Sequence, residues 1–210
     1  MIALFNMLVK ILAWPVQWLC FRTKVTYEDK KAQSRKIKGK AILVSNHRAV
    51  YDYAVFLFVF FTRTLRYQMA EVLLQKKVLG LFLKCMGGIK LDRYSNDFAF
   101  LDKSAKILQN GGVVGIFPES RLPLKDEARP LPFKVGAVYL AKKTGSPIIP
   151  IYTNGSYFTK KRARVVIGKP VYCEDLWDNG KSEKENLQNI SEYLRQKTVA
   201  LGEMLNEEQR

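Results

Sequence analysis

The sequence predicts a single-domain α/β sandwich with a mostly parallel sheet. Short apolar runs alternate with longer segments whose apolar residues recur at helical spacing, a pattern typical of parallel sheets covered by helices. With 210 residues, 48% of them hydrophobic and 26% charged, the chain can build one sizeable core and is too apolar to be disordered. The predicted strands are residues 41–44, 89–91, 113–117, 147–152 and 164–168.

Residues 1–22 are predicted to form a membrane-associating helix that precedes the domain. The segment is apolar except for a few residues, and on a helical wheel Asn6, Lys10 and Gln17 fall within about 40° of one another. A lysine at the centre of a bilayer costs about 2.5–3.5 kcal/mol, which favours a helix lying in one leaflet over one that spans the membrane. A buried N-terminal core helix is the alternative.

The main domain is predicted to cover residues 23–182, with an amphipathic helix over 183–210 packed on it. The apolar stripe of this last helix consists of Leu187, Ile190, Leu194, Leu201 and Leu205. Within the domain, the segments predicted to be helical are 53–61, 72–86, 98–108 and 133–143.

The charge of the chain predicts an anionic partner. The formal net charge is +16 and the pI is about 9.8, and residues 22–40 are especially basic. Nucleic acid, an acidic membrane and phosphorylated substrates all fit this charge. The sequence has no recognisable nucleic-acid-binding motif, so we expect no nucleic acid partner. A basic segment just after an apolar one is typical of placement at the cytoplasmic face of a membrane.

The cysteines and the histidine limit the chemistry further. The three cysteines are odd in number and widely spaced, which predicts neither a disulfide framework nor a zinc site. His47 is the only histidine, so we expect no metal site. Any reaction that needs a side chain titrating near neutrality on an unperturbed pKa must use it.

His47 follows the predicted strand 41–44, and Asp52 comes five residues later at the start of a predicted helix. On one straight helix, side chains five residues apart lie about 140° apart and do not meet. If His47 is in the loop instead, the chain can fold back so that Asp52 accepts the Nδ1 proton and leaves Nε2 free as a base. The alternative is a surface histidine near a helix-capping aspartate.

Four motifs in order resemble those of the glycerolipid acyltransferases, the family that includes the bacterial 1-acylglycerol-3-phosphate acyltransferases. The first is Asn46-His47 followed by four residues and Asp52. The others are Gly-Gly-Ile-Lys-Leu-Asp-Arg at 87–93, Ile-Phe-Pro-Glu-Ser-Arg at 116–121 and Pro-Ile-Ile-Pro-Ile at 147–151. Together they span roughly residues 40–155, which makes the resemblance far more specific than any single motif.

The resemblance implies transfer of a fatty acyl group from acyl-CoA or acyl carrier protein to lysophosphatidic acid, giving phosphatidic acid. His47 would be the general base and Asp52 would orient it. No G-x-S-x-G nucleophile motif is present, so no covalent acyl-enzyme and no cofactor are expected. The residues implied to bind substrate are Asn46, Lys90, Arg93, Glu119 and Arg121.

The third motif departs from the family's usual Phe-Pro-Glu-Gly-Thr-Arg. Here it is one residue shorter, with Ser120 in place of glycine. The cation that reaches the substrate phosphate could therefore be Arg121, or Arg129 or Lys134 further on. The acceptor could also be glycerol-3-phosphate or another lysophospholipid, and a non-catalytic lipid-surface binding protein is the alternative from a different class.

Overall fold

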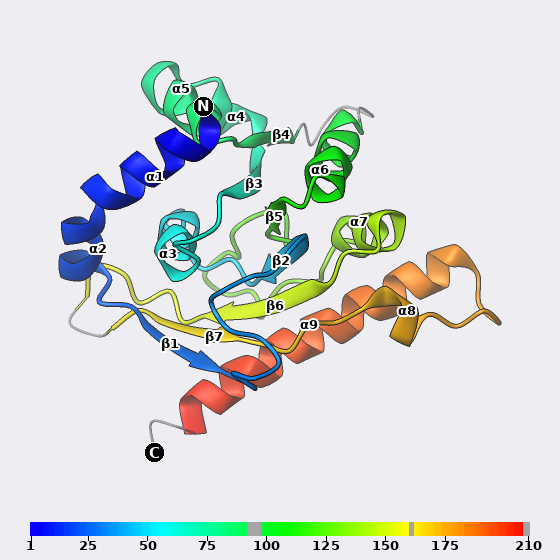
Figure 1. The fold of residues 1–210 in the computed structure, drawn as a ribbon. Helices are drawn as coiled ribbons and strands as arrows, with labels where there is room; N and C mark the ends of the chain where they lie inside the picture. Colours follow the sequence, from blue (N-terminus) through cyan, green and yellow to red (C-terminus); the bar gives the residue numbers. More distant parts are fainter. Residues whose placement is uncertain (92–97, 160–161, 208–210) are drawn as a thin grey trace.

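The computed structural model describes residues 1–91, 98–159 and 162–207. Its centre is a seven-stranded sheet in the order β1-β7-β6-β2-β5-β3-β4 (Figure 1). All neighbouring strands are parallel except β6 and β7. The predicted α/β architecture with a mostly parallel sheet is therefore confirmed. The strands are β1 (Lys24–Tyr27), β2 (Ala41–Ser45), β3 (Leu65–Ala70), β4 (Ile89–Leu91), β5 (Val113–Ile116), β6 (Ile148–Thr153) and β7 (Arg164–Ile167).

Helices cover both faces of this sheet. One face carries α1 (Ile2–Leu12), α2 (Trp14–Cys20), α3 (Asp52–Val59), α4 (Glu71–Leu74) and α5 (Lys77–Cys85). The other carries α6 (Ala99–Gln109), α7 (Gly136–Thr144), α8 (Cys173–Leu176) and α9 (Glu183–Glu207). The long helix α9 lies along β6 and β7 and also contacts α7 (Figure 1).

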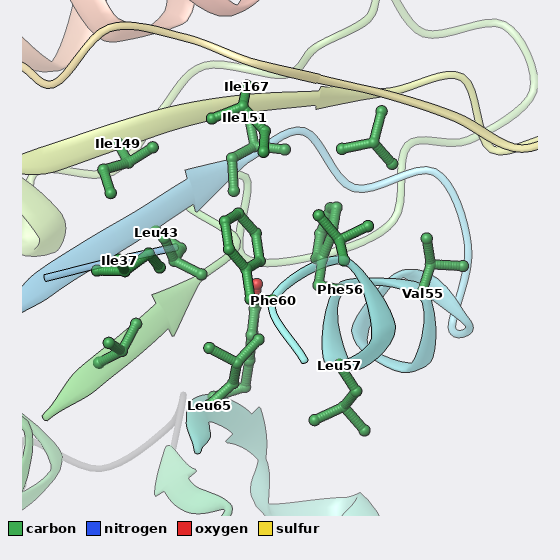
Figure 2. Close-up of a cluster of buried hydrophobic side chains, with 14 of the residues drawn as sticks. Ile37, Leu43, Val55, Phe56, Leu57, Phe60, Leu65, Ile149, Ile151 and Ile167 are labelled. Carbon is green, nitrogen blue, oxygen red and sulfur yellow. The ribbon is translucent and has the colours of Figure 1, made fainter. Parts of the chain in front are cut away.

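The core on the α3 side is built around aromatic residues. Figure 2 shows Phe60, just after α3, among side chains from three strands: Leu43 of β2, Leu65 of β3 and Ile151 of β6. All four side chains are fully buried. The packing fixes α3, which begins with Asp52, against one face of the central strands.

Two strands, β1 and β3, were not predicted. The basic segment 22–40 contains β1, which pairs with β7 at the edge of the sheet and is only partly buried. An edge strand needs few apolar residues, so β1 has no continuous apolar run. The lysines around it made the whole segment resemble a solvated connection. β3 alternates buried and half-buried residues and lies between β5 and β4.

Two predicted helices are wrong in their extent. The helix predicted over 72–86 is broken into α4 and α5, and Gly80 of α5 packs directly on the end of α4. A Cβ atom at Gly80 would lie 2.3 Å from the Leu74 carbonyl oxygen. The helix predicted over 1–22 breaks at Ala13, and its halves differ in direction by 50°. Pro15 explains this break, since it lacks the N–H that a continuous helix requires.

The N-terminal helices turn their polar stripe inward. Asn6 and Lys10 are only 1% and 2% exposed. The Lys10 ammonium donates to the carbonyl oxygens of Phe61 at 3.1 Å and Arg63 at 2.6 Å, just beyond α3. Burial lowers the pKa of Lys10 to about 8. The apolar side chains face outward instead: Leu4, Leu8, Ile11, Leu12, Trp14, Val16, Trp18 and Leu19 are all exposed.

The lengths of these helices bear on the membrane prediction. In the described part of the chain, no helix on its own has the length and apolar character needed to cross a bilayer. α1 and α2 meet that test only when taken together as a bent pair.

A glycine in β5 leaves room for an aromatic ring of the neighbouring strand to pack on the sheet. Gly115 is opposite Tyr67 of β3, and a Cβ atom at Gly115 would lie 2.1–2.4 Å from atoms of the Tyr67 ring. This ring is 1% exposed and its centroid lies 5.1 Å from that of Phe117, so it has no room to move away. We expect Gly115→Ala to lower the free energy of unfolding by about 1–3 kcal/mol, as measured by urea denaturation.

Gly136→Ala is the matched control for this prediction. Gly136 begins α7, and a Cβ atom there would have no neighbour within 4 Å. Alanine is favoured over glycine in a helix, so this variant should be as stable as the wild type or more so. Equal stability of the two variants would contradict the packing role of Gly115.

Candidate active site

His47 and Asp52 meet at the carboxyl end of β2. His47 lies two residues beyond the strand, and Asp52 is the first residue of α3. The His47 Nδ1 atom is 2.8 Å from the Asp52 Oδ2 atom. The loop between them folds back as the spacing predicted, so the carboxylate is the acceptor for an Nδ1–H proton. That tautomer leaves the lone pair of Nε2 for a substrate.

Asp52 is fully buried and its carboxylate has several donors. Besides His47, the Oδ2 atom accepts the backbone N–H groups of Arg48 at 2.7 Å and Ala49 at 2.9 Å. The Oδ1 atom accepts the Tyr157 hydroxyl at 2.5 Å. A buried carboxylate with this many donors is held in one orientation.

The imidazole of His47 is stacked on an aromatic ring. Its centroid lies 4.2 Å from that of Phe117, with an angle of 15° between the planes. The His47 side chain is 19% exposed, so one part of the ring reaches solvent while Phe117 covers the other. Phe117 comes directly after β5, the neighbour of β2 in the sheet.

Glu119 supports the histidine loop through the backbone. Its Oε1 atom accepts the His47 N–H at 2.6 Å, and its Oε2 atom accepts the Leu131 N–H at 2.8 Å. Burial raises the pKa of Glu119, although both N–H donors act against this shift. The resemblance implied that Glu119 binds substrate, and in the structure each of its carboxylate oxygens accepts a backbone N–H group.

Asn46 joins two strand ends. Its Nδ2 atom donates to the Thr153 carbonyl oxygen at 2.9 Å, and its Oδ1 atom accepts the Thr153 N–H at 2.8 Å. The side chain is 2% exposed. Asn46 therefore ties the end of β2 to the end of β6, whereas the resemblance implied that it binds substrate.

The predicted phosphate-binding residues lie in different settings. Arg121 forms a two-pronged ion pair with Glu127, with Nη1–Oε2 and Nη2–Oε1 distances of 2.6 and 2.5 Å. The Lys90 ammonium is 2.5 Å from Glu71 and lines a groove of about 710 Å³ beside α4 and α5. Arg93 lies outside the described residues.

The altered third motif has an unusual backbone. Ser120 has a φ angle of 63°, in the left-handed region that glycine adopts without strain. It stands where the family usually has glycine, and it adopts a φ angle that glycine favours. The turn directs Arg121 toward the loop that contains Glu127.

The residues that the sequence did not reveal are Tyr157, Thr153 and Phe117. Tyr157 contacts Asp52 from 105 positions away, and no local spacing could indicate this. Phe117 lies inside the third motif, and the sequence predicts it only as the end of a buried strand. Over residues 1–91, 98–159 and 162–207, no group of three or more His, Cys, Asp or Glu side chains is arranged to hold a metal ion.

Comparison with known proteins places this geometry in a family. The Acyltransferase family model matches residues 22–154, which include His47, Asp52, Glu119 and Arg121. The chain belongs to the Acyltransferase family. The matched residues end before Tyr157, so the acyltransferase motifs alone do not cover every group that contacts Asp52.

Several relatives of this acyltransferase have names that state a reaction. A 1-acyl-sn-glycerol-3-phosphate acyltransferase of Bacillus subtilis is 28% identical over 148 residues, 68% of this chain and 71% of that protein. A protein of the same name from Borreliella burgdorferi is 29% identical over 167 residues, 73% of this chain and 63% of that one. The crystal structure of the LPA acyltransferase PlsC from Thermotoga maritima superposes with a TM-score of 0.65 at 22% identity, covering 95% of this chain and 78% of that one. This last likeness shows the fold.

Proposed function

We propose that this acyltransferase moves a fatty acyl group from acyl-CoA or acyl carrier protein to the free hydroxyl of lysophosphatidic acid, giving phosphatidic acid. The observation that carries the proposal is the 2.8 Å contact between His47 Nδ1 and the buried carboxylate of Asp52. The names of the relatives from Bacillus subtilis and Borreliella burgdorferi support this choice of acceptor.

The proposed reaction needs one base and one orienting acid. His47 Nε2 accepts the proton of the acceptor hydroxyl while the oxygen attacks the thioester carbonyl carbon. The carbon–sulfur bond then breaks, and the imidazolium returns the proton to the leaving thiolate. Asp52 stabilises the imidazolium throughout. The scheme uses no covalent acyl-enzyme, no metal and no cofactor other than the acyl donor.

Arg121 is the described residue that we propose for the substrate phosphate, because its guanidinium can form paired hydrogen bonds with phosphate oxygens. In the structure Glu127 fills that position with a carboxylate, which is an anion of similar geometry. The ion pair lowers the pKa of Glu127 to about 2, so the carboxylate stays ionised at any working pH. Protonation of Glu127 therefore does not release Arg121, and the substrate phosphate competes with this carboxylate for the guanidinium.

Glu127→Gln is therefore expected to lower the KM for lysophosphatidic acid by about two- to fivefold, with kcat unchanged, because exposed ion pairs of this kind are weak. The measurement is initial acyl transfer against acceptor concentration. Asp126→Asn is the matched control, since it removes the same charge from the neighbouring position. If both variants lower KM equally, general charge and not release of Arg121 explains the effect.

We further propose that the enzyme works at the cytoplasmic face of an anionic membrane. The exposed apolar residues of α1 and α2, together with Val78 and Leu81 of α5, offer a surface for lipid. The chain has a net charge of +16, which favours acidic headgroups over neutral ones. Cys20, Cys85 and Cys173 are free thiols, in keeping with a reducing compartment.

The test is acyl transfer from labelled acyl-CoA and labelled acyl carrier protein, each offered with lysophosphatidic acid in vesicles that contain anionic lipid. Phosphatidic acid formed with either donor would support the proposal and identify the donor. The same assay with glycerol-3-phosphate and with lysophospholipids of other headgroups is the second arm. Product only in this second arm would mean that the acceptor is glycerol-3-phosphate or another lysophospholipid. Vesicle binding without product in either arm would favour a non-catalytic lipid-binding protein.

A further inference from the structure

The carboxylate of Asp52 uses its two oxygens differently. Oδ2 contacts His47 and two backbone N–H groups, while Oδ1 accepts the hydroxyl of Tyr157 at 2.5 Å. Both side chains are buried, Asp52 at 0% and Tyr157 at 7% exposure. A short hydrogen bond between a phenol and a carboxylate in such a place is a strong, charge-assisted one.

We propose that Tyr157 is a positioning residue for the catalytic pair, which makes the site a chain of Tyr157, Asp52 and His47. The proposal rests on the function proposed above, since it concerns the base of that reaction. The Tyr157 hydroxyl donates to Asp52 and not to His47, so we propose that it acts on the base through Asp52.

The phenol is itself fixed by its surroundings. Its oxygen is 2.9 Å from the Thr153 hydroxyl, and because the phenol proton goes to Asp52, Thr153 is the donor in that contact. The Thr153 backbone is bound on both sides by Asn46, which directly precedes His47. Phe21 packs edge-on against the Tyr157 ring at 5.5 Å. The end of β6 thus holds the histidine loop and the far side of Asp52 together.

The charged and titratable groups around Asp52 come from several elements. His47 and the backbone of Arg48 face it from the loop, and Glu119 faces His47 from the loop after β5. Tyr67 of β3 and Tyr53 of α3 lie behind it, and burial raises the pKa of both phenols, so they stay neutral. Burial also raises the pKa of Tyr157, which keeps its proton available to Asp52.

Removing the phenol proton should change the basicity of the pair. Without a hydrogen-bond donor at Oδ1, the negative charge of Asp52 is no longer partly neutralised by the phenol. The charge then acts more strongly on the imidazole of His47. The imidazolium form of His47 is then favoured, and less of the neutral base exists at a given pH. A group that only filled space would have no such effect.

The decisive variant is Tyr157→Phe. We expect kcat to fall about tenfold while KM stays within about twofold. The acid limb of the kcat/KM profile should move to higher pH by about 0.5 unit or more. The matched control is Tyr67→Phe, because the Tyr67 hydroxyl is buried with no hydrogen-bond partner in the described part of the chain. That variant should keep the wild-type profile.

A second readout is independent of turnover. His47 is the only histidine in the protein, so its imidazole signals in an NMR titration are unambiguous. We expect the midpoint of this titration to move to higher pH in Tyr157→Phe and to move less, in the same direction, in Thr153→Val. If the enzyme transfers no acyl group to any acceptor, the function proposed above fails, whereas the titration still decides the role of Tyr157.

The proposal is overturned if the midpoint and the acid limb both stay at their wild-type pH. A lower kcat with an unmoved limb would also overturn it, because this result assigns Tyr157 a merely structural role. If Tyr157→Phe does not fold, Thr153→Val carries the test, since it weakens the same chain without changing any group that touches Asp52.

Discussion

Replacing His47 with alanine is expected to reduce the formation of phosphatidic acid by about 10²–10⁴-fold, the usual contribution of a general base. No other histidine exists in the chain to take over the proton transfer. The side chain is partly exposed and its Nδ1 contact is with Asp52, so its loss leaves the sheet and the core unchanged. The assay is initial acyl transfer at saturating acceptor.

Two measurements separate this effect from a loss of folding. His47→Ala should keep the thermal midpoint of the wild type to within a few degrees and should bind anionic vesicles equally well. Asp52→Asn should also lose most of its activity, because an amide no longer fixes the Nδ1–H tautomer. Wild-type activity in His47→Ala would remove the histidine from the mechanism and with it the proposed scheme.

The second large effect concerns the membrane. Changing Leu8 of α1 and Trp18 of α2 together to glutamate is expected to weaken binding to anionic vesicles by at least about a hundredfold. Each large apolar side chain contributes about 1.5–3 kcal/mol when it is transferred from water into an apolar environment, and glutamate adds charge repulsion. The two side chains are 50% and 67% exposed, so the change removes no contact in the core. Vesicle sedimentation measures the binding.

Tyr193→Glu provides the matched control for the charge. Tyr193 is 41% exposed on α9, which covers the opposite face of the sheet (Figure 1). This variant adds one negative charge, against two in the double variant, at an exposed aromatic position, and it should bind vesicles within about twofold of the wild type. If it loses binding as strongly as the double variant, net charge and not the α1–α2 surface governs the attachment.

Local patterns predicted the strands that form the middle of the sheet. β2, β5 and β6 are continuous apolar runs because both of their faces are buried. β1 lacks that signal because it is a basic edge strand, and β3 lacks it because only alternate residues are buried. Edge and half-buried strands depend on their neighbours, which a short sequence window does not contain.

The site divides in the same way. The contact of His47 with Asp52 was predictable because five residues and one turn bring the two side chains together. Tyr157 and Thr153 were not, because they reach the site through the pairing of β6 with β2. The ion pair of Arg121 with Glu127 depends on how the loop from Arg121 to Leu131 folds back. The sequence did not indicate that partner.

The inward polar stripe of α1 is bound to the segment just beyond α3. Lys10 donates to the carbonyl oxygens just beyond the carboxyl end of α3, and the amino end of the same helix is Asp52. A displacement of α1 along its axis would therefore pull on the helix that holds the orienting acid. The position of α1 and the orientation of Asp52 are therefore mechanically coupled through α3.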